Sequence, residues 1–383
     1  MNDRTQSYVR GRFGDYYRRT SIDLPRSPDD REWAFIPFSG GMVRHRSLLD
    51  LGDLETWLAD QKPRHVYFSS ARYESPEASS MKAKGWTGAQ LVFDLDADHL
   101  RETSPDDSYS EMLSNCKTAL VRLVEFLVED FGFDDVETVF SGGRGYHVHV
   151  YDDEVQRLGS EARREIVDYV QGMGFDPQLA FSDETAAGDF GRTPTGVKKL
   201  ESGGWGRRIR DYILDFADEV AETEDGTAVE RLREFEGVGQ KKAEKLLSVF
   251  RDPDRREELA RGNLDVVGGT RGFWETLMRE AVSERRAEAD EPVTTDTKRL
   301  IRLPGSLHGG TGLRVTRVEV DEIESFDPLT DAVVFSDSQI QVESSEPTTV
   351  EVGGRSFNID EGVSKVPEYA GVFAVLRKDV ELA

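Results

Sequence analysis

Two aspartates at the end of an apolar segment are the first residues whose types and spacing could do chemistry. Residues 91–96 read Leu-Val-Phe-Asp-Leu-Asp, a β-prone run that contains Asp94 and Asp96. Because side chains alternate along a strand, residues two positions apart project to the same side, within reach of one shared ion. Close carboxylates repel unless a cation neutralises them, and Mg²⁺ or Mn²⁺ prefers oxygen ligands. The pair predicts a divalent-metal site, with a solvated acidic turn as the open alternative.

A glycine-rich run at residues 141–149, Ser-Gly-Gly-Arg-Gly-Tyr-His-Val-His, has the composition of a phosphate-binding turn. Its glycines let the backbone approach an anion, and Ser141 and Arg144 offer a hydroxyl and a guanidinium to phosphate oxygens. His147 and His149 alternate along the following strand, so His147, nearer the turn, would point with Arg144 towards the phosphates. We expect a triphosphate-binding turn here rather than a plain hairpin with core histidines.

A third run, residues 293–309, sets one carboxylate among basic residues. Asp296 could complete a three-carboxylate metal site with the two aspartates of the first run. Arg302 and His308 would then neutralise phosphate oxygens as charge develops on a leaving pyrophosphate. Alone, this run would read as an ordinary hairpin with solvated charges.

The composition limits the class of protein. The chain has 383 residues, a single cysteine, and 49 Lys and Arg against 74 Asp and Glu, which gives a formal net charge of −25. No stretch approaches the ~20 apolar residues of a membrane span, and no apolar leader begins the chain, so we expect a cytoplasmic protein without a membrane partner. Such acidity normally argues against binding nucleic acid. It also fits a halophilic cytosol, where molar salt shortens the Debye length to about 3 Å, so partners must be inferred from local clusters of arginine.

The candidate residues need a sheet to position them. Apolar periodicity predicts a helix over 109–129 and a short amphipathic helix over 368–377. The alternation of strands and helices argues for a mixed sheet flanked by helices, interrupted from about 160 to 290 by a charged helical region. The expected strands are 33–38, 65–69, 91–95, 136–140, 146–151, 300–303 and 313–320.

In this order and at these separations, the three runs resemble the catalytic small subunit of the archaeal and eukaryotic-type DNA primase, over nearly the whole chain. The resemblance implies an α+β fold, a mixed-sheet primase catalytic core with an inserted helical subdomain. It implies domains at 1–160 (core, first part), 161–290 (mostly helical insertion) and 291–383 (core, second part, with C-terminal strands and a short helix). The acidity indicates a halophilic archaeon. Shorter matches lie at 16–19, 31–33, 42–46 and 84–86.

The implied activity is that of a DNA-templated nucleotidyltransferase that makes short primers de novo for DNA replication, with extension by deoxynucleotides as an open addition. Two divalent ions, Mg²⁺ or Mn²⁺, would be held by three matched carboxylates: Asp94, Asp96 and Asp296. Asp98 and His149 match no catalytic position. The residues that match nucleotide-binding positions are Ser141, Arg144, His147, Arg302, His308 and, less closely, Arg44.

One departure from the family concerns zinc. Many relatives carry a zinc-binding Cys/His cluster after the acidic strand, whereas this chain has only Cys116 there, with His99 upstream. Because two ligands cannot close a tetrahedral site, we expect no structural zinc. The resemblance implies three partners: a primase large subunit in a heterodimer, a single-stranded DNA template and nucleoside triphosphates.

Other functions stay open at this point. A gap-filling repair polymerase of the same superfamily would use the same residues on primed templates. A glycosyltransferase could use Asp94 and Asp96 to hold a nucleotide-sugar, but it has no use for the other two runs. A non-catalytic DNA-binding module could be built on residues 234–247, where Gly-Val-Gly precedes a lysine-rich helix, as in one half of a helix-hairpin-helix. That segment is equally compatible with a helix capped by a glycine turn.

Overall fold

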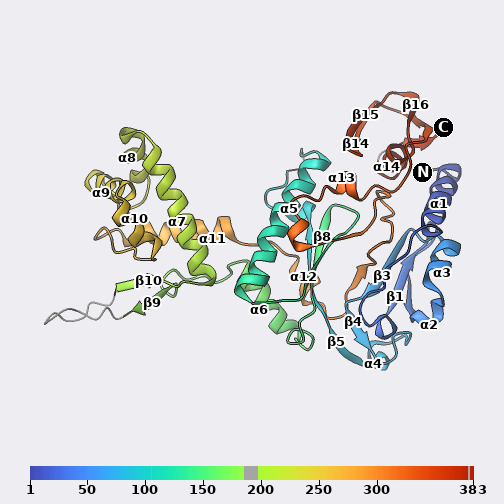
Figure 1. The fold of residues 1–383 in the computed structure, drawn as a ribbon, viewed down its shortest axis with the longest axis horizontal. Coiled ribbons are helices and arrows are strands. Elements are labelled where there is room, and N and C mark those ends of the chain that lie inside the picture. The colour runs from blue at the N-terminus through green and yellow to red at the C-terminus, as the bar shows by residue number, and fades with distance from the viewer. Residues whose placement is uncertain (105, 185–196, 378–379) are drawn as a thin grey trace. The chain divides into compact units, whose positions relative to one another are not determined.

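The chain folds into two compact units (Figure 1). The computed structural model describes residues 1–383 except 105, 185–196 and 378–379. None of the helices in these described residues is long and apolar enough to cross a membrane. Unit 1 comprises 1–128, 133–167 and 288–383, and unit 2 comprises 129–132 and 168–287.

Two four-stranded sheets form the centre of unit 1, in the orders β11-β3-β1-β2 and β12-β7-β8-β6. All their pairings are antiparallel, which confirms the α+β class but differs from the single mixed sheet that we expected. Strands β6 and β7 run in the same direction and could have formed a parallel pair. Strand β8 turns back after β7 and lies between them, so β6 and β7 never pair directly. The strands are β1 (Trp33–Ile36), β2 (Val43–Arg46), β3 (His65–Ser69), β6 (Leu91–Asp96), β7 (Val136–Phe140), β8 (Gly145–Val150), β11 (Leu300–Arg302) and β12 (Thr316–Val318).

Smaller strand groups complete unit 1. A three-stranded sheet has the order β16-β13-β17, and two hairpins pair β4 with β5 and β14 with β15. The two chain ends lie side by side (Figure 1), where the backbone N–H of Asn2 donates to Glu381 Oε1 at 2.9 Å. The bounds are β4 (Ala71–Tyr73), β5 (Trp86–Ala89), β13 (Gln339–Ser344), β14 (Thr348–Val352), β15 (Arg355–Ile359), β16 (Gly362–Pro367) and β17 (Val380–Leu382).

Helix α5 (Tyr109–Glu125) supports the strand that carries the two aspartates. It begins with a capping box between Ser108 and Glu111, and its buried residues recur every three or four positions from Leu113 to Leu123. This apolar stripe packs against β8 and β6. The other helices that begin in unit 1 are α1 (Asp3–Tyr17), α2 (Leu48–Leu51), α3 (Leu54–Gln61), α4 (Met81–Lys84), α6 (Ser160–Val170, which continues into unit 2), α12 (Glu291–Thr295), α13 (Pro328–Asp331) and α14 (Glu368–Arg377).

Unit 2 is built mainly of helices around a core of its own, in which α7 contacts α9, α10 and α11. It also contains a strand pair, β9 (Phe181–Glu184) and β10 (Val197–Leu200), that we did not expect, because four-residue strands offer too few positions to show a period of two. The helices are α7 (Gly204–Glu222), α8 (Asp225–Arg233), α9 (Gln240–Arg251), α10 (Pro253–Ala260) and α11 (Arg271–Arg285).

The glycine turn at 237–239 lies between α8 and α9, and Gly239 caps the N-terminus of α9. Lys242 points back towards this turn: its Nζ donates to the carbonyl oxygens of Gly237 at 2.9 Å and Gly269 at 2.8 Å. This lysine therefore stabilises the turn itself. Binding of DNA by residues 234–247 stays a hypothesis from the sequence.

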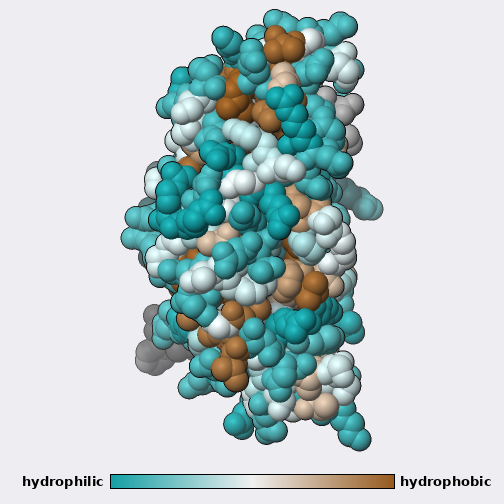
Figure 2. Space-filling model, turned by 90° about the vertical axis from the view of Figure 1, so that its right-hand side faces the viewer, coloured by the Kyte–Doolittle hydropathy of each residue, from teal (hydrophilic) through white to brown (hydrophobic). Residues whose placement is uncertain are grey.

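Hydrophilic residues dominate the face of the molecule seen in Figure 2, with only small, scattered hydrophobic patches. This agrees with the high proportion of charged residues, 32%, in the sequence.

Candidate active site

Strand β6 carries Asp94 and Asp96 and pairs with β8. The register places Asp94 opposite His147 and Asp96 opposite Gly145, and His147 Nε2 lies 3.6 Å from Asp94 Oδ1. Leu95, between the two aspartates, is buried, whereas both carboxylates are partly exposed. The alternation along the strand therefore turns both carboxylates to the same open side.

The glycine turn between β7 and β8 approaches its neighbours more closely than any side chain would allow. Gly142 has φ +75°, and a Cβ at this position would lie 2.6 Å from the Cβ of His308. A Cβ at Gly145 would lie 1.8 Å from the carbonyl oxygen of Leu95. These glycines bring the turn against both β6 and the loop that holds His308.

One cavity of about 350 Å³ collects most of the predicted site residues. Three separate stretches of sequence contribute to it: the end of β6, the glycine turn with the start of β8, and the segment from β11 to residue 311. The end of α14 contributes as well. The predicted residues that line it are Asp94, Asp96, Ser141, Arg144, His147, Arg302 and His308; further lining residues are Leu95, Gly143, Gly145, Gly310, Thr311, Leu376 and Arg377.

The environment of Asp94 favours a bound cation. Burial, followed by the charges of Asp96 and Asp290, raises the pKa of Asp94 to about 6. A cation beside the two aspartates would stabilise their ionised forms. Their oxygen donors suit Mg²⁺ or Mn²⁺ better than a soft metal. Within the described ranges, no group of three His, Cys, Asp or Glu side chains is gathered for a metal. The fit to a divalent ion therefore depends on Asp94 and Asp96.

The histidines of the cavity are uncharged. Burial first, and then the charge of Arg302, lowers the pKa of His147 to about 3. The same two causes hold the pKa of His308 well below its ordinary value. A neutral imidazole offers one donor and one acceptor but no charge. Positive charge for an anion must therefore come from arginine.

Two of the arginines were predicted and differ in their surroundings. Arg144 Nη1 lies 2.5 Å from Asp98 Oδ2, so Asp98 forms an ion pair with this side chain. The guanidinium of Arg302 lies 5.7 Å from the ring centroid of Tyr67, and its Nε is buried without a hydrogen-bond partner. An unpaired buried donor costs free energy, and a phosphate oxygen would satisfy it.

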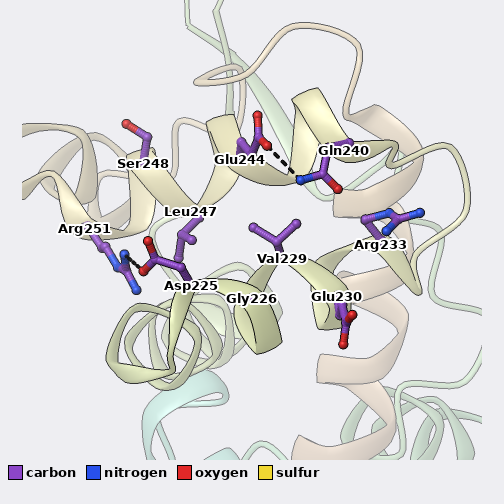
Figure 3. Close-up of a pocket in the computed structure, with 10 residues that line it drawn as sticks. All are labelled: Asp225, Gly226, Val229, Glu230, Arg233, Gln240, Glu244, Leu247, Ser248 and Arg251. Carbon is purple, nitrogen blue, oxygen red and sulfur yellow. Dashed lines mark hydrogen bonds and ion pairs between the residues drawn. The ribbon is translucent and has the colours of Figure 1, made fainter.

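A second hollow, of about 550 Å³, lies in unit 2 between α8 and α9 (Figure 3). Polar side chains that line it already pair with one another: Arg251 Nη1 donates to Asp225 Oδ1 at 2.7 Å, and Gln240 Nε2 donates to Glu244 Oε1 at 2.7 Å. None of its lining residues belongs to the predicted site. Of these two cavities, only the one in unit 1 is lined by predicted site residues.

Comparison with known families shows where the chain belongs. The sequence model of the family described as DNA primase small subunit matches residues 93–320, a range that contains every predicted site residue except Arg44. The chain belongs to this family.

Curated relatives named DNA primase small subunit PriS align along the whole primase chain. The protein from Natronomonas pharaonis is 51% identical over 98% of each chain, and that from Halobacterium salinarum is 50% identical over 100% of each. The protein from Methanothrix thermoacetophila is 43% identical over 100% of each. The predicted family is confirmed, and this chain is the catalytic subunit of a DNA primase, a DNA-directed nucleotidyltransferase. The halophilic archaea among the relatives fit the acidic composition.

Two predicted site residues of this primase lie outside the cavity lining. Asp296 follows α12, and its Oδ1 accepts a hydrogen bond from the backbone N–H of Lys298 at 2.9 Å. Arg44 lies in β2, where its Nε donates to Glu32 Oε1 at 3.1 Å. Their roles in metal and phosphate binding stay predictions.

The sequence analysis missed two charged residues near the cavity. Arg377, the last residue of α14, lines it, and Asp290 influences the pKa of Asp94. The helix over 368–377 was predicted, but local periodicity cannot show which distant segment a helix end will meet. The sequence gives no reason to single out Asp290 among the many acidic residues. In the structure, its backbone N–H donates to the backbone carbonyl oxygen of Asp94 at 3.1 Å.

Proposed function

We propose that the cavity of unit 1 binds the incoming nucleoside triphosphate beside two divalent ions, Mg²⁺ or Mn²⁺. Asp94 and Asp96 would hold the ions, with Asp296 as a third ligand. The convergence of two carboxylates and three guanidinium groups on one cavity carries this proposal. Bound divalent ions would supply Lewis-acid activation of the primer 3′-hydroxyl and would neutralise charge on the departing pyrophosphate.

The side chains of the cavity would position the nucleotide. Arg144 and Arg302 would bind phosphate oxygens, and the Ser141 hydroxyl would donate a further hydrogen bond. Neutral His147 and His308 would orient the phosphates by hydrogen bonding, without repelling a metal ion. Arg44 is proposed as a further phosphate contact on the strength of the family resemblance alone. Positioning and charge neutralisation, rather than a covalent intermediate, would account for catalysis.

The name of the relatives supports a set of partners. We propose a heterodimer with a primase large subunit, acting in the cytoplasm on a single-stranded DNA template with nucleoside triphosphates. We also propose that no structural zinc is required. Cys116 is buried and its Sγ lies 3.5 Å from the carbonyl oxygen of Leu95. Burial raises the pKa of this thiol, which disfavours the thiolate that zinc binds.

For the domain organisation, we propose that residues 161–290 are an insertion between the core parts 1–160 and 291–383. The compact unit 2, which includes 168–287, supports this division. Its own hydrophobic core gives it a source of stability independent of the sheets.

A primer-synthesis assay tests the proposed function. The full chain would be incubated at molar KCl with unprimed single-stranded DNA, nucleoside triphosphates and Mg²⁺ or Mn²⁺, with and without the large subunit. De novo primers are expected. Products only from a primed template would instead indicate a gap-filling polymerase, and a parallel reaction with deoxynucleotides would show whether they are also incorporated.

The first prediction concerns Asp96→Asn, which removes a proposed ligand charge but keeps the side-chain volume. We expect nucleotide incorporation to fall by roughly a hundredfold or more, with an unchanged thermal unfolding midpoint. Asp337→Asn, at an aspartate 76% exposed on the surface of the same unit, is the matched control and should keep full activity. Near wild-type incorporation by Asp96→Asn would rule out the proposed metal centre.

A further inference from the structure

Arg377 brings a third guanidinium to the nucleotide cavity from a part of the chain that the family match does not reach. It is the last residue of α14, and it lines the cavity with its neighbour Leu376. The family match ends at residue 320. The C-terminal helix is thus a structural part of the site.

The Arg377 side chain is held in place by an aromatic ring. Its guanidinium lies 3.4 Å from the ring centroid of Tyr109 and 5.3 Å from that of Phe373. Tyr109 in turn donates from its hydroxyl to the carbonyl oxygen of Gly143 at 2.5 Å. Burial raises the pKa of Tyr109 to about 12, so this hydroxyl stays protonated at neutral pH. Tyr109 therefore fixes Arg377 and the glycine turn relative to each other.

A side-chain hydrogen bond with Tyr109 and the charge of Asp98 both act on Arg377. Within the part of the chain that the structure describes, no ion pair involves Arg377, whereas Arg144 is paired with Asp98. A partly buried guanidinium that stacks on a ring keeps its edge donors available, and these match the geometry of phosphate oxygens.

We propose that Arg377 is a third phosphate-binding arginine, which contacts the triphosphate of the incoming nucleotide. This inference rests on the proposed function of the cavity and deepens it, because it makes the C-terminal helix a part of substrate binding. The glycine turn, β11 and α14 would then each supply one arginine to the same anion.

The test compares Arg377→Gln and Arg377→Lys with the wild-type chain, using ATP and inorganic tripolyphosphate as probes. In primer synthesis at molar KCl, Arg377→Gln should raise the KM for ATP by roughly tenfold to a hundredfold. The inhibition constant of tripolyphosphate, which has no base or sugar, should rise by the same factor. Arg377→Lys should recover part of the loss, because it keeps the charge but not the planar fork.

Arg355→Gln is the matched control, since Arg355 also lies near two aromatic rings, those of Phe357 and Tyr369, in the C-terminal region but does not line the cavity. It should leave both constants unchanged. If Arg377→Gln does not fold, two other variants still test the proposal. They are Arg377→Lys, and Tyr109→Phe, which keeps the ring but loses the hydrogen bond to Gly143. Each should raise the KM for ATP and the inhibition constant of tripolyphosphate by the same factor.

Three outcomes would overturn this assignment: unchanged constants in folded Arg377 variants, weaker ATP binding with unchanged tripolyphosphate inhibition, or equal effects of Arg377→Gln and Arg355→Gln. Failure of the proposed function looks different. In that case tripolyphosphate would not compete with ATP even in the wild-type chain, and Arg302→Gln would leave the KM for ATP unchanged.

Discussion

At the residue scale, Glu32 shows how the protein accommodates a buried charge beside its first sheet. Its side chain is fully buried, and Lys84 Nζ, also fully buried, lies 3.1 Å from Glu32 Oε2. Arg44 Nε and the backbone N–H of His45 both donate to Glu32 Oε1 at 3.1 Å. Burial alone would raise the pKa of Glu32, but the hydrogen bonds from Arg44 and Lys84 outweigh it and hold the pKa below its ordinary value. The ionised form is therefore part of the native structure.

The second prediction follows from this lowered pKa. At pH 7, Glu32→Gln should reduce the free energy of unfolding by about 3–5 kcal/mol, because it leaves Lys84 buried without a counter-charge. The lowered pKa contributes stability above the unfolded value of about 4.3, and this contribution is lost as the pH falls through the folded value. The difference between wild type and variant should therefore shrink on acidification, as measured by urea unfolding from neutral pH to about pH 3. A difference that stays constant with pH would contradict the assignment of the charge to Glu32.

The parts of the site that sequence could predict are those that depend on local geometry. Asp94 and Asp96 share a face because of the period of the strand, and the glycine turn places Ser141 and Arg144 together over a few residues. Arg377 could not be predicted, because its place in the cavity depends on contacts between segments far apart in the chain. Spacing alone does not predict that the runs at 91–96, 141–149 and 293–309 meet in one site. That expectation came from the resemblance to the primase family.

At the element scale, the pairing of β6 with β8 positions the two carboxylates against the glycine turn. The backbone of Gly145 packs directly on the carbonyl oxygen of Leu95, and Ser141 N–H donates to Gly145 O at 2.9 Å to close the turn. The turn and strand β6 are therefore joined by direct pairing, and strand pairing transmits any change at Gly145 to the neighbouring Asp96.

The third prediction concerns Gly145→Ala. Its Cβ would overlap the Leu95 carbonyl, so the strands must separate, and we expect a loss of roughly 3 kcal/mol or more in unfolding free energy with loss of activity. Gly11→Ala is the matched control: Gly11 lies inside α1, and an added Cβ there would meet nothing within 4 Å, so this variant should gain about 0.5–1 kcal/mol. Chemical denaturation measures both. A stable, active Gly145→Ala would show that this close approach is not required.

Several elements followed directly from sequence pattern, and the exceptions have physical causes. The strand at 65–69 and the helix at 368–377 have the predicted bounds, because each has a clear apolar pattern and a clear boundary residue. The strand expected at 313–320 is reduced to Thr316–Val318, since Leu313 and Val315 are buried in a loop instead. Apolar residues predict burial there, but burial does not require a strand.

At the scale of the whole molecule, the charge of the site and that of the chain have opposite signs. Three arginines and two aspartates line the cavity, an excess of one positive group, while the chain carries a formal net charge of −25. At low salt, the long-range field of the chain would repel both nucleotide and template. At molar salt, that field is screened, whereas contacts between a partly buried arginine and a phosphate are screened much less. A net acidic primase can therefore bind phosphate in concentrated salt.

The same argument gives the last prediction, which concerns stability. Between about 0.1 M and about 1 M KCl the Debye length falls from ~10 Å to ~3 Å, so mutual repulsion of the exposed carboxylates should fade and the thermal unfolding midpoint should rise. For a chain of this size each kcal/mol gained corresponds to roughly 1 °C. A variant with Asp321→Asn and Glu322→Gln, in the exposed acidic segment 319–324, should melt higher at low salt and show a shallower dependence on KCl. Sucrose strengthens burial without screening charge, so it distinguishes screening of the carboxylates from a general strengthening of burial. If the midpoint were flat in KCl, or if sucrose reproduced its rise in both proteins equally, repulsion between carboxylates would not be what limits the stability of this fold at low salt.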